Sequence, residues 1–134
     1  MAPTIFSIDG SGSGLAAATA LTVQTANPQV QSSVPVFQCA PAMCVAVPIQ
    51  LGTDTSTYLT LYGTGIRNRT SLENVTATVK GTSVSVLYAG PAPGFTGLDQ
   101  VNVVLSLALR GGGDSAVVLK VDGQVSNSVT VNIQ

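Results

Sequence analysis

The chain has 134 residues and a formal net charge of -1, and only 8% of its residues are charged, whereas an ordinary soluble domain carries about 25%. Five Lys and Arg residues are too few and too scattered to bind a nucleic acid through its phosphates. No apolar run approaches the about 18 residues of a membrane span. The sequence contains no His, which excludes a Ser-His-Asp triad, a Cys-His pair and a His-based zinc site. With no catalytic signature left, we expect no enzyme, no cofactor and no bound metal.

At this length we expect one domain spanning residues 1–134, with a sizeable buried core. Met1 leads directly into Ala2 and Pro3, without the basic region and apolar core of a secretory signal. We therefore interpret residues 1–2 as the start of an excised or mature segment. That interpretation leaves an exported parent protein open, and the low lysine content favours export over the cytosol.

Apolar and polar residues alternate with a period of two along most of the chain, which is typical of half-buried strands. Alanines at the start of the second segment would also support a helical turn, but the residues that follow them favour a strand. In chain order, the expected strands cover residues 4–8, 15–25, 34–37, 45–49, 58–62, 74–80, 83–88, 98–105, 117–121 and 124–133.

Two tight turns join neighbouring strands of this set. Gly81 follows the segment 74–80, and Asp122-Gly123 separates the last two segments; both favour hairpins, because glycine accepts the positive φ that a two-residue turn requires. About eight to ten short strands with regular turn signals and no convincing helix predict an all-β fold. We expect an immunoglobulin-like antiparallel β-sandwich, with a closed barrel as the alternative.

Several long motifs carry a resemblance to a known family. Residues 86–103 (VLYAGPAPGFTGLDQVNV) resemble the core motif of an uncharacterised family of C-terminal domains of exported proteins, abundant in soil acidobacteria such as Solibacter. Residues 58–67, 3–12 and 122–131 are similar to other parts of that family, and residues 25–56 are the least constrained. The resemblance implies an exported, modular protein with an immunoglobulin-like fold, and it brings no catalytic residues.

The two cysteines, Cys39 and Cys44, are separated by four residues that include a proline. In an exported domain this spacing predicts a disulfide that pins a hairpin tip. A ring this small would stabilise the fold by about 2 kcal/mol in the entropic model. The alternative is a pair of reduced, buried thiols; a redox role would require a C-x-x-C spacing that is missing.

A glycine-rich stretch at residues 9–14 superficially resembles a calcium loop. It offers only one carboxylate, Asp9, whereas calcium takes six to eight oxygen ligands, usually from several carboxylates. We expect a turning connection here. A cation completed by Asp54 or Asp99 stays open as the alternative.

Aromatic and amide side chains are the first candidates for ligand or partner contacts. Tyr62, Tyr88 and Phe95 lie near predicted strand ends or turns, where exposed rings would stack on sugars. We favour the alternative that they cap the core, as a tyrosine corner does in immunoglobulin-like domains. Gln100 and Asn102 share one face of their strand and would hydrogen-bond either a loop or a ligand.

Arg67 and Arg69 are the second candidates, because they follow directly after a predicted strand. They would bind an anionic group or a partner domain's carboxylate. The favoured alternative is a solvated loop.

Together these features predict a non-enzymatic, exported structural or interaction module of a larger bacterial protein, at the cell surface or outside the cell. Its expected partners are neighbouring domains or other copies of itself, with glycan as a further candidate. Lys80 and Lys120 are the only lysines in predicted strands that could protect sheet edges from pairing. The alternative function is a carbohydrate-binding module that targets a secreted protein to polysaccharide, which requires at least two of the three candidate aromatics on one exposed patch.

Overall fold

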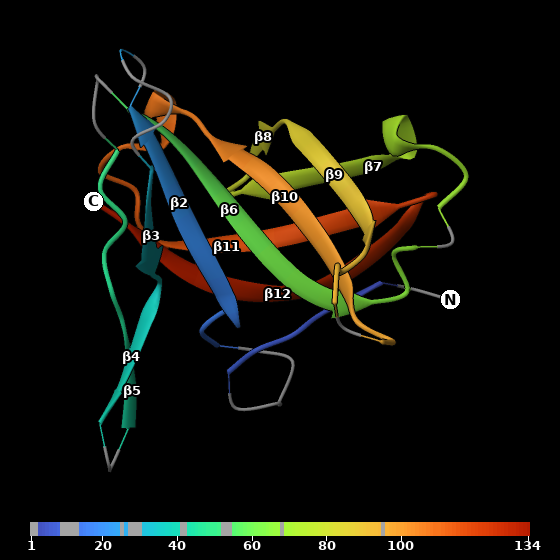
Figure 1. The fold of residues 1–134 in the computed structure, drawn as a ribbon, viewed down its shortest axis with the longest axis horizontal. Coiled ribbons are helices and arrows are strands. Elements are labelled where there is room, and N and C mark those ends of the chain that lie inside the picture. Colours follow the sequence, from blue (N-terminus) through green and yellow to red (C-terminus); the bar gives the residue numbers. More distant parts are fainter. Residues whose placement is uncertain are drawn as a thin grey trace.

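The computed structural model describes residues 3–8, 14–24, 26, 31–40, 43–51, 55–67, 69–94 and 96–134. Within these residues the regular structure is almost entirely β-strand, and its helices are the single 3-10 turns η1 (Leu72–Asn74) and η2 (Leu107–Leu109). The strands form two antiparallel sheets that pack face to face, and a separate hairpin extends beyond them (Figure 1). The predicted all-β sandwich is therefore confirmed.

The first sheet contains six strands, and β1 pairs with the end of β6 outside the main path. In spatial order the sheet contains β3 (Gln31–Pro35), β2 (Ala18–Gln24), β6 (Thr55–Thr64), β10 (Asp99–Leu105) and β9 (Val86–Pro91), with β1 (Thr4–Ile5) at the side.

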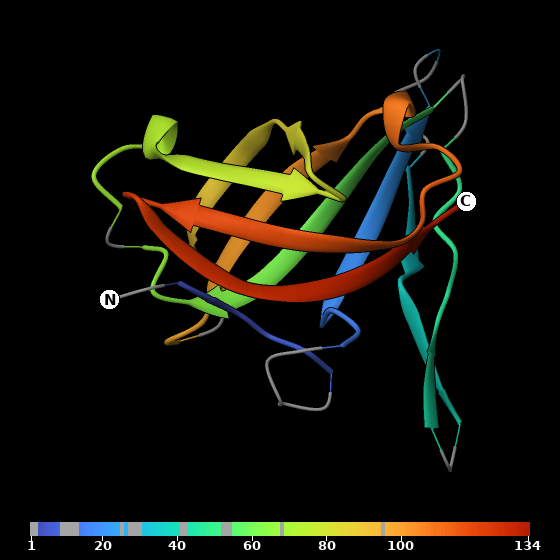
Figure 2. The ribbon, with the colours of Figure 1, turned by 180° about the vertical axis from the view of Figure 1, so that it is seen from behind.

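The second sheet contains four strands. Figure 2 shows it in front of the first sheet, with its strands crossing those of the first at an angle. In spatial order it contains β12 (Gln124–Ile133), β11 (Gly113–Val121), β7 (Val75–Val79) and β8 (Thr82–Val84).

The order of the strands is that of an immunoglobulin-like sandwich. Strands β2, β6, β10 and β9 follow the order A-B-E-D in one sheet, and β12, β11, β7 and β8 follow the order G-F-C-C′ in the other. Along the chain these strands run from A to G in sequence, as in that fold. The closed barrel is excluded, because the two sheets have separate edges.

An insertion between strands A and B accounts for most of the difference from the predicted strands. Instead of two strands at residues 34–37 and 45–49, the chain forms β3, which extends the first sheet, and then the hairpin of β4 (Phe37–Ala40) and β5 (Met43–Ala46). With β1 this gives twelve strands in the described residues, more than the eight to ten expected.

Alternation along the strands builds the core between the sheets. Leu59 and Leu61 of β6 and Val101 and Val103 of β10 point inward and are almost completely buried. From the other sheet, residues such as Leu119 meet them. Burial of side chains of this size contributes about 1.5–3 kcal/mol each, so the period-two pattern is what holds the sheets together.

Both predicted hairpin turns are present. Lys80 and Gly81 have φ angles of 52° and 80°, and Asp122 and Gly123 have φ angles of 50° and 85°. Two consecutive positive φ angles are the signature of the two-residue turn that matches the twist of the flanking strands. In each turn the glycine adopts this conformation without steric cost.

The first strand is held by an unusual pair of contacts. The amide of Ile5 donates to Oδ1 of Asn127 at 2.8 Å, and Nδ2 of Asn127 donates to the carbonyl of Ile5 at 2.9 Å. The side chain of Asn127 thus bonds β1 as a neighbouring strand's peptide group would. On the other side β1 lies against Gly63, where any Cβ would collide with the carbonyl oxygen of Thr4.

Candidate interaction surfaces

The outward side of the first sheet gathers polar and aromatic side chains from three strands. Because Leu61 and Val101 point into the core, their neighbours Tyr62 and Gln100 point outward. Tyr62 lies opposite Gln100 in the register of β6 and β10, and Tyr88 of β9 lies opposite Asn102. We call these four residues, Tyr62, Tyr88, Gln100 and Asn102, the tyrosine face.

The side chain of Tyr88 lies over Gly90, two residues further along β9. A Cβ on Gly90 would approach the Tyr88 hydroxyl to 3.2 Å and its Cζ to 3.5 Å. The hydroxyl donates a hydrogen bond to the carbonyl of Pro91 at 2.5 Å. Gly90 is paired with Gln100, so the end of the Tyr88 ring reaches the row that contains Gln100 and Tyr62. The ring is fixed at both places and remains 36% exposed.

The two amides of the tyrosine face bond to each other. Nε2 of Gln100 donates to Oδ1 of Asn102 at 3.0 Å. Among the described residues, neither Oε1 of Gln100 nor Nδ2 of Asn102 has a hydrogen-bond partner. One acceptor and one donor therefore remain available next to the tyrosine rings.

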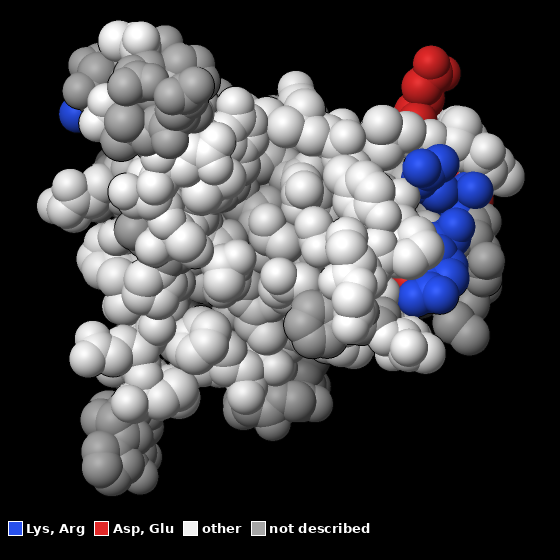
Figure 3. Space-filling view, in the orientation of Figure 1, with Lys and Arg blue, Asp and Glu red and all other residues white. Residues whose placement is uncertain are grey.

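The whole outward side of this sheet is uncharged. Asp99 is the single charged residue in its six strands, and its side chain is turned inward. Figure 3, in the orientation of Figure 1, shows a broad white surface with blue and red groups only at its margins. Besides the tyrosine face it presents residues of the same kind: Thr19, Leu21, Tyr58, Thr60 and Val104.

The candidate aromatics therefore divide into two groups. Tyr62 and Tyr88 share one outward face, so neither caps the core between the sheets, contrary to the favoured prediction. Strand β11, at the F position, contains no tyrosine, so there is no tyrosine corner on it. Phe95 lies outside the described residues. Sequence reasoning missed Tyr58, although its position four residues before Tyr62 places it on the same face.

Arg67 holds the start of β10 rather than standing free in the loop. Its Nε donates to Oδ1 of Asp99 at 2.6 Å, and its Nη2 donates to the carbonyl of Leu98 at 3.1 Å. The amides of Ile66 and Arg67 both donate to Oδ2 of Asp99, at 2.9 and 3.1 Å. The Asp99 side chain is 3% exposed and that of Arg67 is 38% exposed.

Two opposing effects act on the pKa of Asp99. Burial alone would raise it, but the hydrogen bonds from the Ile66 amide and from the side chain and amide of Arg67 lower it, as does the guanidinium charge. The lowering effects win, so the pKa of the Asp99 carboxyl lies below its ordinary value. Asp99 is therefore a carboxylate at neutral pH, with each oxygen accepting from the 66–67 segment.

Arg69 and its neighbour Thr70 tie the same loop to other strands. Nε of Arg69 donates to the carbonyl of Ala89 at 2.7 Å. The amide and hydroxyl of Thr70 donate to the carboxylate of Asp122, in the turn between β11 and β12. Arg67 and Arg69 thus both have hydrogen-bond partners within the chain. The carboxylate that Arg67 binds is that of Asp99, in the same domain and not in a partner.

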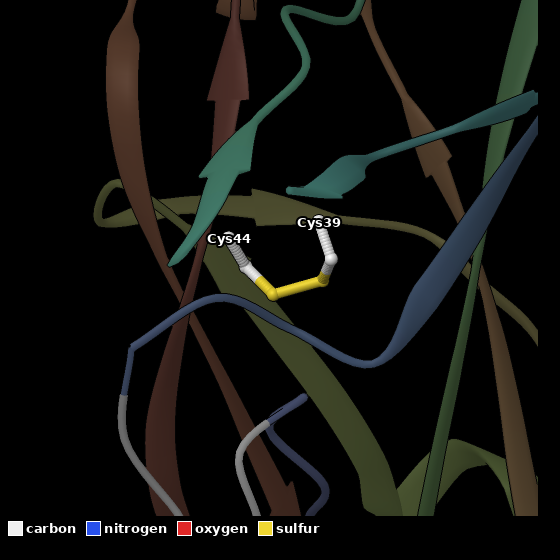
Figure 4. Close-up of a disulfide and its surroundings, with 2 residues drawn as sticks. All are labelled: Cys39 and Cys44. Atoms are coloured by element: carbon white, nitrogen blue, oxygen red, sulfur yellow. A yellow bond between two sulfur atoms is a disulfide. The ribbon is translucent and has the colours of Figure 1, made fainter. Parts of the chain in front are cut away.

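Cys39 and Cys44 form a disulfide, as predicted. They lie directly opposite each other in the β4–β5 pair, next to the hairpin tip, and Figure 4 shows the bond joining the two strands. We call β4 and β5 together the arm. It extends away from both sheets (Figures 1 and 2), and both cysteines are exposed, so the alternative of buried thiols is excluded.

A groove of about 630 Å³ separates the root of the arm from the first residues of the chain. Phe37 and Cys39 line one side, and Phe6 and Ile8 line the other. In Figure 4 the disulfide faces the blue segment that leads into β2. The groove is mainly apolar, and Phe6 is 37% exposed.

The described residues provide no set of ligands for the cation that was the alternative at the glycine-rich stretch. Asp9 and Asp54 lie outside the described residues, and Asp99 is engaged by Arg67. Nowhere in the described ranges do three or more His, Cys, Asp or Glu side chains come together as metal ligands would. The described chain also contains no helix of sufficient length and apolarity to span a membrane.

Comparison with known proteins gives no match: no family model, no curated protein and no solved structure is significantly similar to this chain. The resemblance to the acidobacterial C-terminal domains therefore stays a prediction. What the fold defines is the class, an immunoglobulin-like sandwich with an A–B insertion, and its function has to follow from the surfaces just described.

Proposed function

We propose that the protein is a non-enzymatic, exported interaction module that contacts neighbouring domains of a parent protein or other copies of itself. The observation that carries this proposal is the arm, an ordered hairpin that lies outside both sheets. Two strands of four residues each are at best marginally stable alone in water, and here a disulfide offsets that weakness. A stabilised hairpin that contributes little to the core is well suited to contact another molecule.

The exposed chemistry of the arm supports a protein partner. Val45 is 50% exposed, and Gln38 and the two cysteines are also exposed. In the described chain, β4 and β5 pair only with each other, so each has an outer edge of backbone groups that another strand can extend.

Neither of the two lysines that were expected to protect sheet edges, Lys80 and Lys120, lies on an edge strand. Lys80 lies in the hairpin turn after β7, and Lys120 lies in β11, which is an interior strand between β12 and β7. Neither side chain therefore blocks pairing at the arm, which supports contact between copies.

Export is supported by the disulfide, because such bonds persist mainly in oxidising compartments. The same argument supports our proposal of a location at the cell surface or outside the cell, and the larger bacterial parent protein is proposed from the resemblance of residues 86–103 alone. Adhesion and domain spacing are the activities that a sandwich with one projecting arm would serve.

The arm is tested by self-association. We expect sedimentation velocity to show a concentration-dependent dimer of the oxidised protein, and we expect Val45→Asp to weaken it. Val125→Asp is the matched control, because Val125 is even more exposed, at 59%, but lies on β12; this variant should associate like the wild type.

A strict monomer at all concentrations would exclude contact between copies. Contact with a neighbouring domain would then be measured in the parent protein by hydrogen exchange. If the amides of β4 and β5 exchange equally fast in the isolated domain and in the parent, the arm contacts nothing and the proposal is overturned.

A further inference from the structure

We propose that the tyrosine face binds a neutral, extended polysaccharide. This function goes beyond the contacts made by the arm and uses a different surface. The alternative prediction from the sequence required at least two of the candidate aromatics on one exposed patch. Tyr62 and Tyr88 both point outward from the same sheet. Tyr88 is exposed and Tyr62 is half-buried, which supports that prediction without fully meeting its requirement.

The two rings are placed as stacking surfaces for successive parts of one chain. Neighbouring strands lie about 4.8 Å apart, so β6 and β9, which flank β10, lie about 10 Å apart. This distance exceeds the width of one sugar ring. The C–H faces of sugar rings pack against aromatic rings, and a chain lying across β10 would contact Tyr62 at one place and Tyr88 at another.

Hydrogen-bonding groups lie between the rings where a bound chain would place its hydroxyls. Gln100 stands next to Tyr62, and Asn102 stands next to Tyr88. The available Oε1 of Gln100 and Nδ2 of Asn102 provide one acceptor and one donor, and a sugar hydroxyl can serve either. An apolar surface with a few placed polar groups is the usual composition of a small-molecule binding site.

The electrostatics of the face select a neutral ligand. No charged side chain points outward from the strands of this sheet. The arginines nearest to it, Arg67 and Arg69, are bonded to Asp99 and to backbone carbonyls. An acidic polysaccharide would therefore gain no free cation on this surface.

Tyr88 is fixed before any ligand arrives. Its ring lies against Gly90, and its hydroxyl is bonded to the carbonyl of Pro91. A side chain that is already ordered loses little rotational freedom on binding, and this preorganisation increases affinity.

Affinity electrophoresis in gels containing soluble polysaccharide tests the proposal. We expect mixed-linkage β-glucan, xyloglucan or xylan to retard the wild-type protein, and polygalacturonate and alginate to leave its mobility unchanged. Isothermal titration with the retarding polysaccharide then gives the dissociation constant. Tyr62→Ala and Tyr88→Ala should each weaken binding by about tenfold or more, the loss expected for one stacking contact.

Three further variants make the test specific. Val125→Ala is the control, because Val125 is 59% exposed and lies on β12 of the other sheet. Tyr88→Phe keeps the ring and should retain most binding. Gly90→Ala brings a methyl group to 3.2 Å from the Tyr88 hydroxyl, so the end of the ring has to shift slightly, and binding should weaken. Thermal unfolding by circular dichroism confirms that each variant is folded.

The proposal is overturned if no neutral polysaccharide retards the protein, if the tyrosine variants bind like the wild type, or if an acidic polymer binds better. A variant that replaces residues 38–45 with a short glycine linker separates this function from that of the arm. It should keep polysaccharide binding and lose self-association, so either proposal can fail without the other.

Discussion

The side chain of Asp99 connects the start of β10 to the loop that follows β6. It lies at the start of β10, paired with Gly63 near the end of β6, and it accepts hydrogen bonds from the backbone of residues 66 and 67. Its carboxylate thus replaces the backbone partners that the chain loses where β6 ends. Without it, two buried or half-buried amide groups would have no acceptor, which costs about 1–3 kcal/mol for each such group.

We predict that Asp99→Asn lowers the free energy of unfolding by about 1–3 kcal/mol at neutral pH, as measured by urea denaturation. Asparagine keeps one acceptor oxygen but loses the charge that Arg67 binds. Arg67→Gln is the comparison variant, and it should lose less, because the Arg67 side chain is 38% exposed. Equal losses in both variants would show that the ion pair, rather than the backbone contacts, supplies the stability.

The same residue predicts a pH dependence. The pKa of Asp99 is lowered in the folded state, whereas an unfolded Asp titrates near about 3.9. Its contribution is therefore complete above the unfolded pKa and is lost as the pH falls through the folded pKa. The stability difference between wild type and Asp99→Asn should shrink steadily below about pH 4, and a difference that persisted to the lowest pH would contradict this assignment.

At the residue scale the sequence predicted positions better than partners. The places of Tyr62 and Tyr88 near predicted strand ends were sufficient to select them, but whether a side chain faces the core depends on its position in the alternation along its strand. The neighbours Leu61 and Ala89 already indicated the outward side, since alternate residues point to opposite faces. The partner of Arg67 was not predictable, because Asp99 lies 32 residues away in the sequence.

The arm shows that local sequence also predicts a hairpin better than it predicts the sheet that each neighbouring strand joins. The hairpin tip and its disulfide followed from local spacing, and both are confirmed. The boundaries of the neighbouring strands were wrong, because the chain changes sheets at Val36, which is buried between β3 and β4. Alternation of side chains does not indicate which sheet a strand joins.

We predict that reduction of the disulfide leaves the sandwich folded and loosens the arm. The loss in unfolding free energy should not exceed about 2 kcal/mol, the entropic value for so short a ring. Hydrogen exchange should accelerate for amides of the arm and stay slow for those near Leu59 and Val117, which are fully buried. Cys39→Ser with Cys44→Ser should reproduce the reduced state, and a collapse of the near-ultraviolet tyrosine signal would show that the arm supports the core after all.

At the scale of the whole molecule, the strand order was the part that no local pattern revealed. Alternation and turn signals predicted an all-β sandwich, and the two hairpins predicted the β7–β8 and β11–β12 pairs. The pairing of β2 with β6 and of β6 with β10 joins segments far apart in the sequence. Their uncharged outward side became visible only when these strands were placed together.

The low charge predicts that stability hardly depends on salt. Only 8% of the residues are charged, and the described residues contain one ion pair. Salt can therefore screen few charge interactions, and the free energy of unfolding should change little. The urea midpoint should be nearly the same at about 0.01 M and about 1 M NaCl, where the screening length falls from about 30 to about 3 Å. A shift much larger than the value of one surface ion pair, about 1 kcal/mol, would indicate charge interactions outside the described residues.

The path of the chain through the sandwich determines how the module would respond to tension. The two chain ends lie at opposite ends of the long axis (Figures 1 and 2). The final strand is also bonded to earlier segments that run parallel to it, through Ala16 with Thr130 and Ile49 with Asn132. A force applied through both ends would load these hydrogen bonds in shear, where many break together rather than one after another. If it has the neighbouring domains that we propose, such a sandwich would transmit a pull between them before it unfolds.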